Sequence, residues 1–104
     1  MQVEGISVDT SHVGDLVVVT VHGEIDLGSA PILQETLDAL APDQHVVLDC
    51  AGVGFIDSTG LHLVVTQAQR LENGGGSLRL RNAGFPVRHV IEITGLIQLI
   101  GPDD

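Results

Sequence analysis

The stretch VVLDCAGVGFIDSTGLHLVVTQAQRLE, residues 46–72, combines a strand pattern with the clearest helix pattern of the chain. Residues 46–50 are apolar apart from one aspartate and predict a strand buried inside a sheet. The glycine-containing residues 51–56 (AGVGFI) predict a turn-like connection. Residues 59–72 predict a helix, because apolar side chains recur there at helical spacing, namely at Leu61, Val64, Val65, Ala68 and Leu71. A strand joined to an amphipathic helix is the building unit of an α/β sheet.

Two further strands are predicted ahead of this stretch, at residues 3–9 and 16–22. The first pattern is weak, whereas the second (LVVVTVH) is β-branched and apolar nearly throughout. Residues 11–15 (SHVGD) predict the turn between them. A helix is expected next, with Ser29 as its N-cap, three leucines at helical spacing, and Pro42 as its end.

The C-terminal third continues the alternation of strands and helices. A triple glycine, residues 74–76, ends the central helix. Residues 77–82 alternate between apolar and polar side chains, which predicts a strand with one face in water. A short helix is predicted from Pro86 to a C-cap at Gly95, and residues 99–100 predict a last short strand.

These elements fit one domain that spans residues 1–104. We predict an α/β fold, with a mostly parallel sheet of four or five strands and helices packed mainly on one face. Parallel strands end at the same edge of a sheet, so the motif GEID (residues 23–26) and the motif FIDSTG (residues 55–60) are expected to be neighbours. In open α/β sheets this edge is the usual place for ligands and partners.

The charge composition excludes several classes of function. The chain has 14 Asp and Glu residues against four basic residues, all of them arginines, and a formal net charge of −10. This leaves no clustered positive charge for nucleic acid or anionic lipid, and no lysine for a Schiff base or a P-loop. The N-terminal residues do not resemble a signal peptide, and no apolar run approaches the ~20 residues of a membrane span. We expect a cytoplasmic protein that binds neither nucleic acid nor membrane directly.

No metal or cofactor is expected either. The single cysteine, Cys50, ends a buried strand pattern and is interpreted as a small buried hydrophobe. The five histidines are scattered, and no pair of them stands with carboxylates at metal-ligand spacing. Gly52 and Gly54 form a GxG pattern, but the spacing that follows does not fit a nucleotide-binding loop.

Ser58 and Thr59 stand at the mouth of the central helix, where backbone N–H groups have no partner within the helix. A helix N-terminus favours negative charge, so a phosphate on either hydroxyl is well placed. Asp57 adjoins this position, and Asp26 is expected to face it across the neighbouring loops. A phosphate would add roughly −1.5 to −2 charge and would disrupt a contact tuned to a neutral hydroxyl. The same residues are typical of a plain helix N-cap, and the two roles are compatible.

Three motifs together resemble the STAS domain family, specifically its bacterial anti-sigma factor antagonists. The run FIDSTGLHLVV (residues 55–65) is similar to the central signature of that family. VHGEID (residues 21–26) resembles the motif at the end of the family's second strand, and ITGL (residues 93–96) resembles the motif after its penultimate helix. The order of elements and the length match as well, so the resemblance covers essentially the whole chain.

The resemblance implies a phosphorylation switch without catalysis. In the family, an anti-sigma factor that is also a serine kinase phosphorylates the serine after the aspartate, and a phosphoserine phosphatase removes the phosphate. The unphosphorylated antagonist binds the kinase and thereby releases the sigma factor. Ser58 corresponds to the phosphoacceptor, with Thr59 as the alternative that some relatives use. The partner-binding residues implied in this way are Asp26, Asp57, Ser58, Thr59, Gly60 and His62.

Two other classes of function are compatible with the sequence. Ser58 and His62 lie one helical turn apart, and an aspartate beside them would complete a nucleophile–base–acid set. However, this spacing does not generally aim an imidazole at an N-cap hydroxyl, and the sequence has no GxSxG elbow. Alternatively, a STAS adaptor subunit of a lipid-transport or stress-signalling complex would keep the fold without needing a phosphorylated Ser58.

Overall fold

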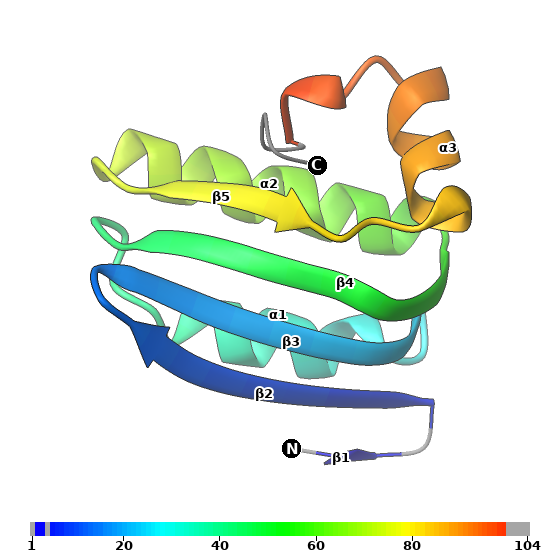
Figure 1. Cartoon of the computed structure of the whole chain (residues 1–104), viewed down its shortest axis with the longest axis horizontal. Coiled ribbons are helices and arrows are strands. Elements are labelled where there is room, and N and C mark those ends of the chain that lie inside the picture. Colours follow the sequence, from blue (N-terminus) through cyan, green and yellow to red (C-terminus); the bar gives the residue numbers. More distant parts are fainter. Residues whose placement is uncertain (1, 4, 100–104) are drawn as a thin grey trace.

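Strands and helices alternate along the chain in nearly the expected order (Figure 1). The computed structural model describes residues 2–3 and 5–99. The strands are β1 (Gln2–Val3), β2 (Ile6–Val13), β3 (Leu16–Ile25), β4 (His45–Ile56) and β5 (Ser77–Arg81). The helices are α1 (Ala30–Asp38), α2 (Ser58–Asn73) and α3 (Phe85–Ile93), followed by the 3₁₀ helix η1 (Ile97–Leu99).

The strands form one sheet in the order β1-β2-β3-β4-β5. The pairs β1–β2 and β2–β3 are antiparallel, whereas β3–β4 and β4–β5 are parallel. α1 and α2 connect the parallel strands and run behind the sheet in the view of Figure 1, while α3 lies at the β5 side. The predicted α/β fold is therefore confirmed, and its parallel part is the part that carries the two crossover helices.

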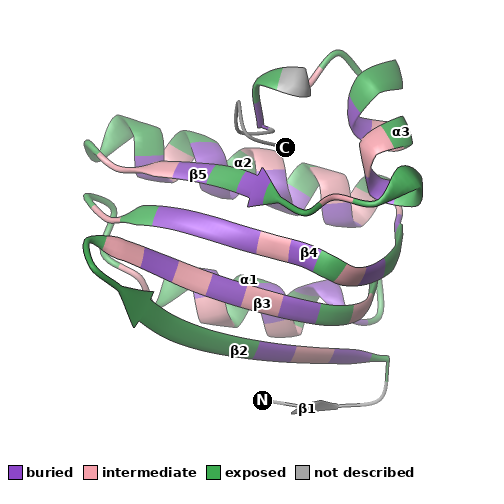
Figure 2. Cartoon of the chain, viewed as in Figure 1, coloured by how far each residue is buried: buried purple, intermediate pink, exposed green. Residues whose placement is uncertain are grey.

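The core lies between the sheet and helices α1 and α2. Along β3 the side chains alternate between buried and partly exposed, with Val17, Val19 and Val21 almost fully buried (Figure 2). Cys50 in β4 is buried too, which confirms its interpretation as a small core residue. The other elements contribute apolar side chains to the same cluster, among them Leu33, Leu37, Val46, Leu48, Val64, Leu71, Leu78 and Leu80.

Three strands are longer than the sequence pattern predicts. β2 continues through residues 11–13, which the pattern assigns to a turn, and β3 extends to Ile25. β4 spans 12 residues, so the segment 51–56 is strand and not a turn-like connection. The pairing of β3 with β4 shifts register twice in this region. Such bulges admit extra residues without ending a strand. The glycines at positions 52 and 54 therefore lie within β4, although the sequence pattern predicts a turn-like connection there.

Gly52 shows why a glycine stands inside β4. The imidazole of His22, on the neighbouring strand β3, occupies the space that a side chain at Gly52 would need. The glycine therefore makes room for a neighbouring side chain, a known use of glycine inside strands. The sequence pattern alone does not distinguish this use from a turn.

The central helices begin and end close to the predicted positions. α2 starts one residue early, at Ser58, and ends before the triple glycine. α1 ends at Asp38, four residues ahead of Pro42. Arg70 of α2 covers the end of α1, because its guanidinium donates from Nη2 to the Leu37 carbonyl at 2.7 Å and from Nη1 to the Leu40 carbonyl at 3.2 Å. A side chain of α2 thus provides the C-terminal cap of α1.

The C-terminal end differs from the prediction. α3 ends at Ile93, and Gly95 follows with a φ of 76°. Leu99 belongs to the 3₁₀ helix η1 instead of the predicted last strand, and residue 100 lies outside the described residues. Leu99 is nevertheless buried against the core. Its burial explains the apolar signal in the sequence without any strand pairing.

Candidate functional site

The carboxyl ends of β3 and β4 bring the two predicted loops together. Ile25 and Ile56 are register partners in this parallel pair. The Asp57 N–H donates to the Ile25 carbonyl oxygen at 3.1 Å. The predicted proximity of the motifs GEID and FIDSTG is therefore confirmed, although both strands end later than the sequence pattern indicates.

Asp57 joins the two loops through its carboxylate. It is the N-cap of α2, and its Oδ1 accepts a hydrogen bond from the Gly60 N–H at 2.9 Å. Its Oδ2 accepts from the Leu27 N–H, in the loop after β3, at 3.2 Å. Both oxygens are thus engaged by backbone groups. The carboxylate fixes the start of α2 relative to the loop between β3 and α1.

Asp26 and Ser29 shape that loop. Asp26 Oδ1 accepts from the Gly28 and Ser29 N–H groups at 3.1 and 3.0 Å. Ser29 occupies the N-cap position of α1, as predicted, but its side chain makes no capping hydrogen bond. Its hydroxyl instead accepts from the Asp26 N–H at 3.0 Å and donates to the Glu24 carbonyl at 2.5 Å. The Ser29 hydroxyl thus ties the start of α1 back to the end of β3 and stabilises the loop between them.

Ser58 is the exposed hydroxyl at the mouth of α2, beside half-buried Asp57 and Thr59. Gly60 differs from the other residues implied to bind the partner, because it is buried. A Cβ on Gly60 would come within 2.5 Å of the Ile25 carbonyl oxygen. Because it has no side chain, Gly60 lets the first turn of α2 pack closely against β3. It therefore lies beneath the surface of the site and is not part of that surface.

A groove lies between α1 and α2, directly beside this helix mouth. Its volume is about 200 Å³, and Thr59 and the exposed His62 are among its lining residues. The rest of the lining consists of Ala30, Gln34, Leu63, Thr66 and Gln67. His62 is therefore exposed on the same surface as Thr59, whereas a groove completed by α1 was not predicted from the sequence.

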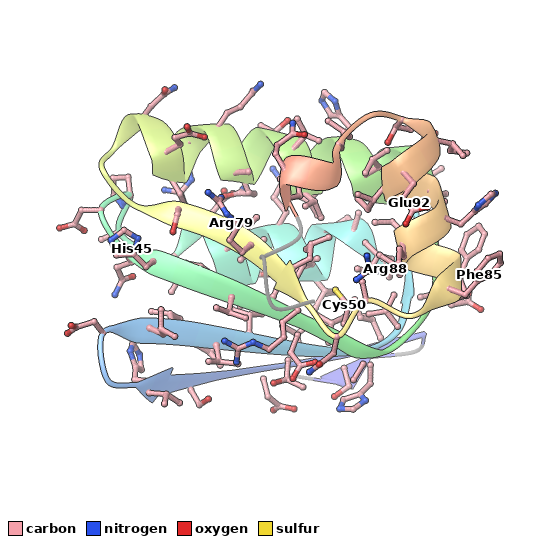
Figure 3. The ribbon with its side chains drawn as sticks, turned by 45° about the horizontal axis from the view of Figure 1, so that its top comes forward. His45, Cys50, Arg79, Phe85, Arg88 and Glu92 are labelled. Carbon is pink, nitrogen blue, oxygen red and sulfur yellow. The ribbon has the colours of Figure 1, made fainter. Side chains whose placement is uncertain are left out.

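Large apolar side chains are exposed at the same end of the sheet. Leu27, in the loop after β3, is 73% exposed, and Phe55, near the end of β4, is 47% exposed. Phe85 starts α3 after the end of β5, projects from the molecule (Figure 3) and stacks on His89 with ring centroids 5.3 Å apart. Exposed apolar side chains next to carboxylates are typical of surfaces that contact another protein.

The two loops of the site carry no basic side chain. No lysine or arginine precedes Arg70, and the guanidinium of Arg70 is engaged by the end of α1. The other arginines lie on β5 and α3, where Figure 3 labels Arg79 and Arg88. The site therefore has carboxylates without neighbouring cations on the same loops, which favours a positively charged partner.

The described residues hold no group of three or more His, Cys, Asp or Glu side chains that could bind a metal ion. His12 lies in β2 and not in a turn, and His45 pairs with Ser77 at 2.8 Å between Nδ1 and Oγ. Among the described helices, none combines the length and apolar character needed to cross a membrane.

Comparisons with known proteins agree with this architecture. The family model described as STAS domain matches residues 7–103. The anti-sigma-B factor antagonist of Bacillus subtilis (strain 168) is 36% identical over 96 residues, which cover 91% of this chain and 88% of the relative. The crystal structure of an anti-sigma factor antagonist from Mycobacterium paratuberculosis superposes with a TM-score of 0.77, at 28% identity, over 91% of this chain and 82% of that one.

A third match is the structure of the Bacillus cell fate determinant SpoIIAA in its phosphorylated form. It superposes with a TM-score of 0.71 over 91% of this chain and 89% of that one. The sequence identity is 22%, so this likeness concerns the fold. Each of the three matched proteins covers 91% of this chain.

Proposed function

Since the chain belongs to the STAS domain family, we propose that it acts as an anti-sigma factor antagonist whose binding to an anti-sigma factor kinase is switched off by phosphorylation of Ser58. The observation that carries this proposal is the exposed Ser58 hydroxyl at the N-terminus of α2, next to the Asp57 carboxylate that joins the two loops. The names of the matched relatives, and the phosphorylated form in which one of them was solved, support it.

The setting of Ser58 explains how a phosphate would act. Asp57 already takes the Gly60 N–H, so a phosphate on Ser58 would face outward, toward a partner. It would add roughly −1.5 to −2 charge next to the Asp57 carboxylate, while Asp26 adds a further negative charge on the neighbouring loop. No arginine of this chain stands on these loops to neutralise it. The phosphate therefore changes the surface without requiring the fold to move.

The surface around Ser58 suits the binding of another protein, and the proposed function requires no catalysis by this chain. The exposed side chains of Leu27 and Phe55, on the same two segments as the aspartates, offer apolar contact area. The acidic loops suit a basic patch on the kinase, which also supplies the ATP. In the proposed cycle a phosphoserine phosphatase restores the binding form, and the protein works in the cytoplasm without binding nucleic acid directly.

Mass spectrometry tests the switch directly. The protein is co-expressed with a candidate ATP-binding anti-sigma factor kinase, and intact mass and peptide fragmentation are measured for wild type, Ser58→Ala and Thr59→Ala. We expect one phosphate on Ser58, absent from Ser58→Ala and retained in Thr59→Ala. A phosphate on Thr59 instead would move the switch by one residue.

Binding to the same kinase completes the test. Ser58→Ala is expected to bind like wild type, whereas Ser58→Asp binds weakly, because the added carboxylate repeats the charge of the phosphate. Equal binding by both variants would rule out the switch. If the kinase phosphorylates another substrate but not this protein, the function is that of a constitutive adaptor.

A further inference from the structure

The groove between α1 and α2 adjoins Ser58 but plays no part in the switch described above. We propose that it receives an arginine side chain of the kinase partner. This inference rests on the proposed function and adds a second anchoring point to it. The argument depends on the size of the groove, the chemistry of its walls and the charge around it.

The groove has the size of an anchor site for one side chain. Its volume of about 200 Å³ is below the ~300–1,000 Å³ of pockets that enclose small-molecule ligands. It is also open along the surface between two helices, so it would not enclose a nucleotide. Protein interfaces, in contrast, commonly hold one large side chain in a depression of this kind, and arginine is among the residues enriched there.

The walls combine a small apolar floor with several hydrogen-bonding groups. Ala30 and Leu63 provide apolar contact for an aliphatic stem. Gln34, Thr59 and Thr66 each carry an oxygen that accepts a hydrogen bond. An arginine has both parts, a three-carbon stem and a planar group with five N–H donors. A phenylalanine in the same place would cover these acceptors without bonding them, and a tyrosine or tryptophan would bring a single donor.

One lining residue of the groove, Gln67, is hydrogen-bonded to a carboxylate that lies outside the lining. Gln67 is only 3% exposed and donates from Nε2 to Asp38 Oδ1 at 2.6 Å. Its Oε1 accepts from Arg70 Nε at 3.0 Å, so the amide cannot rotate without losing both bonds. Asp38 lies one helical turn after Gln34 on α1, on the same side of that helix. The carboxylate is thus held next to the Gln67 end of the groove.

The charge around the groove favours a cation over a neutral group. α1 carries Glu35 and Asp38 and no basic residue, and α2 brings one positive charge, Arg70, to the Gln67 end, so carboxylates outnumber cations on the two helices. An arginine is preferred over a lysine because its fork can bond a carboxylate and a neighbouring amide oxygen together. The groove runs along α2 from Thr59, next to Ser58, to Gln67, about two turns further on, so an arginine seated here would hold the kinase beside the helix that begins at Ser58.

Two substitutions test the groove while leaving Ser58 unchanged. Gln34→Trp fills the groove, with Gln69→Trp as its control, because Gln69 is an exposed glutamine on the other side of α2. Asp38→Asn removes the charge but keeps an oxygen for the bond from Gln67, with Asp43→Asn as the control of equal charge change. The dissociation constant of the complex with the kinase, and kcat and KM of Ser58 phosphorylation, are measured for each.

We expect Gln34→Trp to weaken binding at least tenfold and Asp38→Asn about fivefold, mainly through KM, while both controls bind like wild type. In the kinase, one arginine-to-methionine substitution should weaken binding to wild type yet have little further effect on Asp38→Asn, as expected for a coupled pair. Far-UV circular dichroism and melting curves verify that each variant is folded.

The outcomes separate this inference from the proposed function. If wild type binds the kinase and Ser58 is phosphorylated, but folded Gln34→Trp behaves like Gln69→Trp, the groove is not an anchor and only this inference is overturned. The same conclusion follows if no kinase arginine couples to Asp38. If the kinase neither binds nor phosphorylates the wild-type protein, both the proposed function and this inference fall.

Discussion

Replacing Asp57 tests whether one carboxylate holds the two loops of the site together. The change to alanine removes two hydrogen bonds, those from the Gly60 and Leu27 N–H groups. Loss of an N-cap side chain costs about 1 kcal/mol. A further backbone hydrogen bond to a carboxylate contributes about 1–1.5 kcal/mol. The free energy of unfolding of Asp57→Ala should therefore fall by about 2–2.5 kcal/mol.

The change to asparagine separates the two bonds. An asparagine has one accepting oxygen in place of two, so in either orientation its NH₂ group faces one of the two backbone donors. It can satisfy Gly60 or Leu27, but not both. Asp57→Asn should lose about 1 kcal/mol, roughly half the effect of alanine. A plain N-cap without the Leu27 bond would instead make asparagine equal to aspartate.

Urea unfolding followed by far-UV circular dichroism measures these differences, since the chain has no Trp or Tyr for fluorescence. For a domain of about 100 residues, 1 kcal/mol also shifts the melting temperature by ~4–8 °C. The control is Asp43→Asn, an exposed carboxylate in the loop between α1 and β4. Wild-type stability of Asp57→Asn, with a loss only in Asp57→Ala, would refute the bridging role of the second oxygen.

Three further substitutions test other contacts of the site. Gly60→Ala should destabilise by at least about 2 kcal/mol, because its Cβ would meet the Ile25 carbonyl oxygen; a melting curve unchanged within 2–3 °C would contradict this. Ser29→Ala should cost about 2 kcal/mol in urea unfolding, because the Glu24 carbonyl loses its buried donor, whereas Ser29→Thr should retain part of it. Arg70→Met keeps the aliphatic stem but should lose about 2 kcal/mol, and hydrogen exchange should speed up in α1 more than in β4.

The fold was predictable where a residue pattern is compatible with a single type of secondary structure, as helical spacing of apolar side chains is. The apolar positions of α2 match the buried side of the helix, with Val64 and Leu71 fully buried. Glycines were less informative, because the same residue serves a turn, a bulge or a close contact. At Gly52 the missing side chain leaves space for the ring of His22, a residue that is remote in sequence. Only the paired strands reveal which of these uses applies.

The candidate site, like the fold, was predictable from the sequence only in part. That Asp57 and Ser58 stand at a helix mouth followed from local sequence, and so did the nearness of the loop that contains Asp26. The bond from Leu27 to Asp57 could not be predicted, because it depends on the backbone path of a different loop. Gly60 was assigned to the surface by its place in the motif, whereas its closeness to β3 buries it.

The dependence of α1 on other elements has a consequence for the order in which this domain folds. α1 has no capping side chain of its own, no acidic residue in its first turn and no basic residue in its last turn. A helix of nine residues without these features is not stable in isolation. Its C-terminal carbonyls are bonded by Arg70, which is in position only when α2 has docked. We therefore expect α1 to form late, and the segment that frames the site to fold onto a sheet and a helix already assembled.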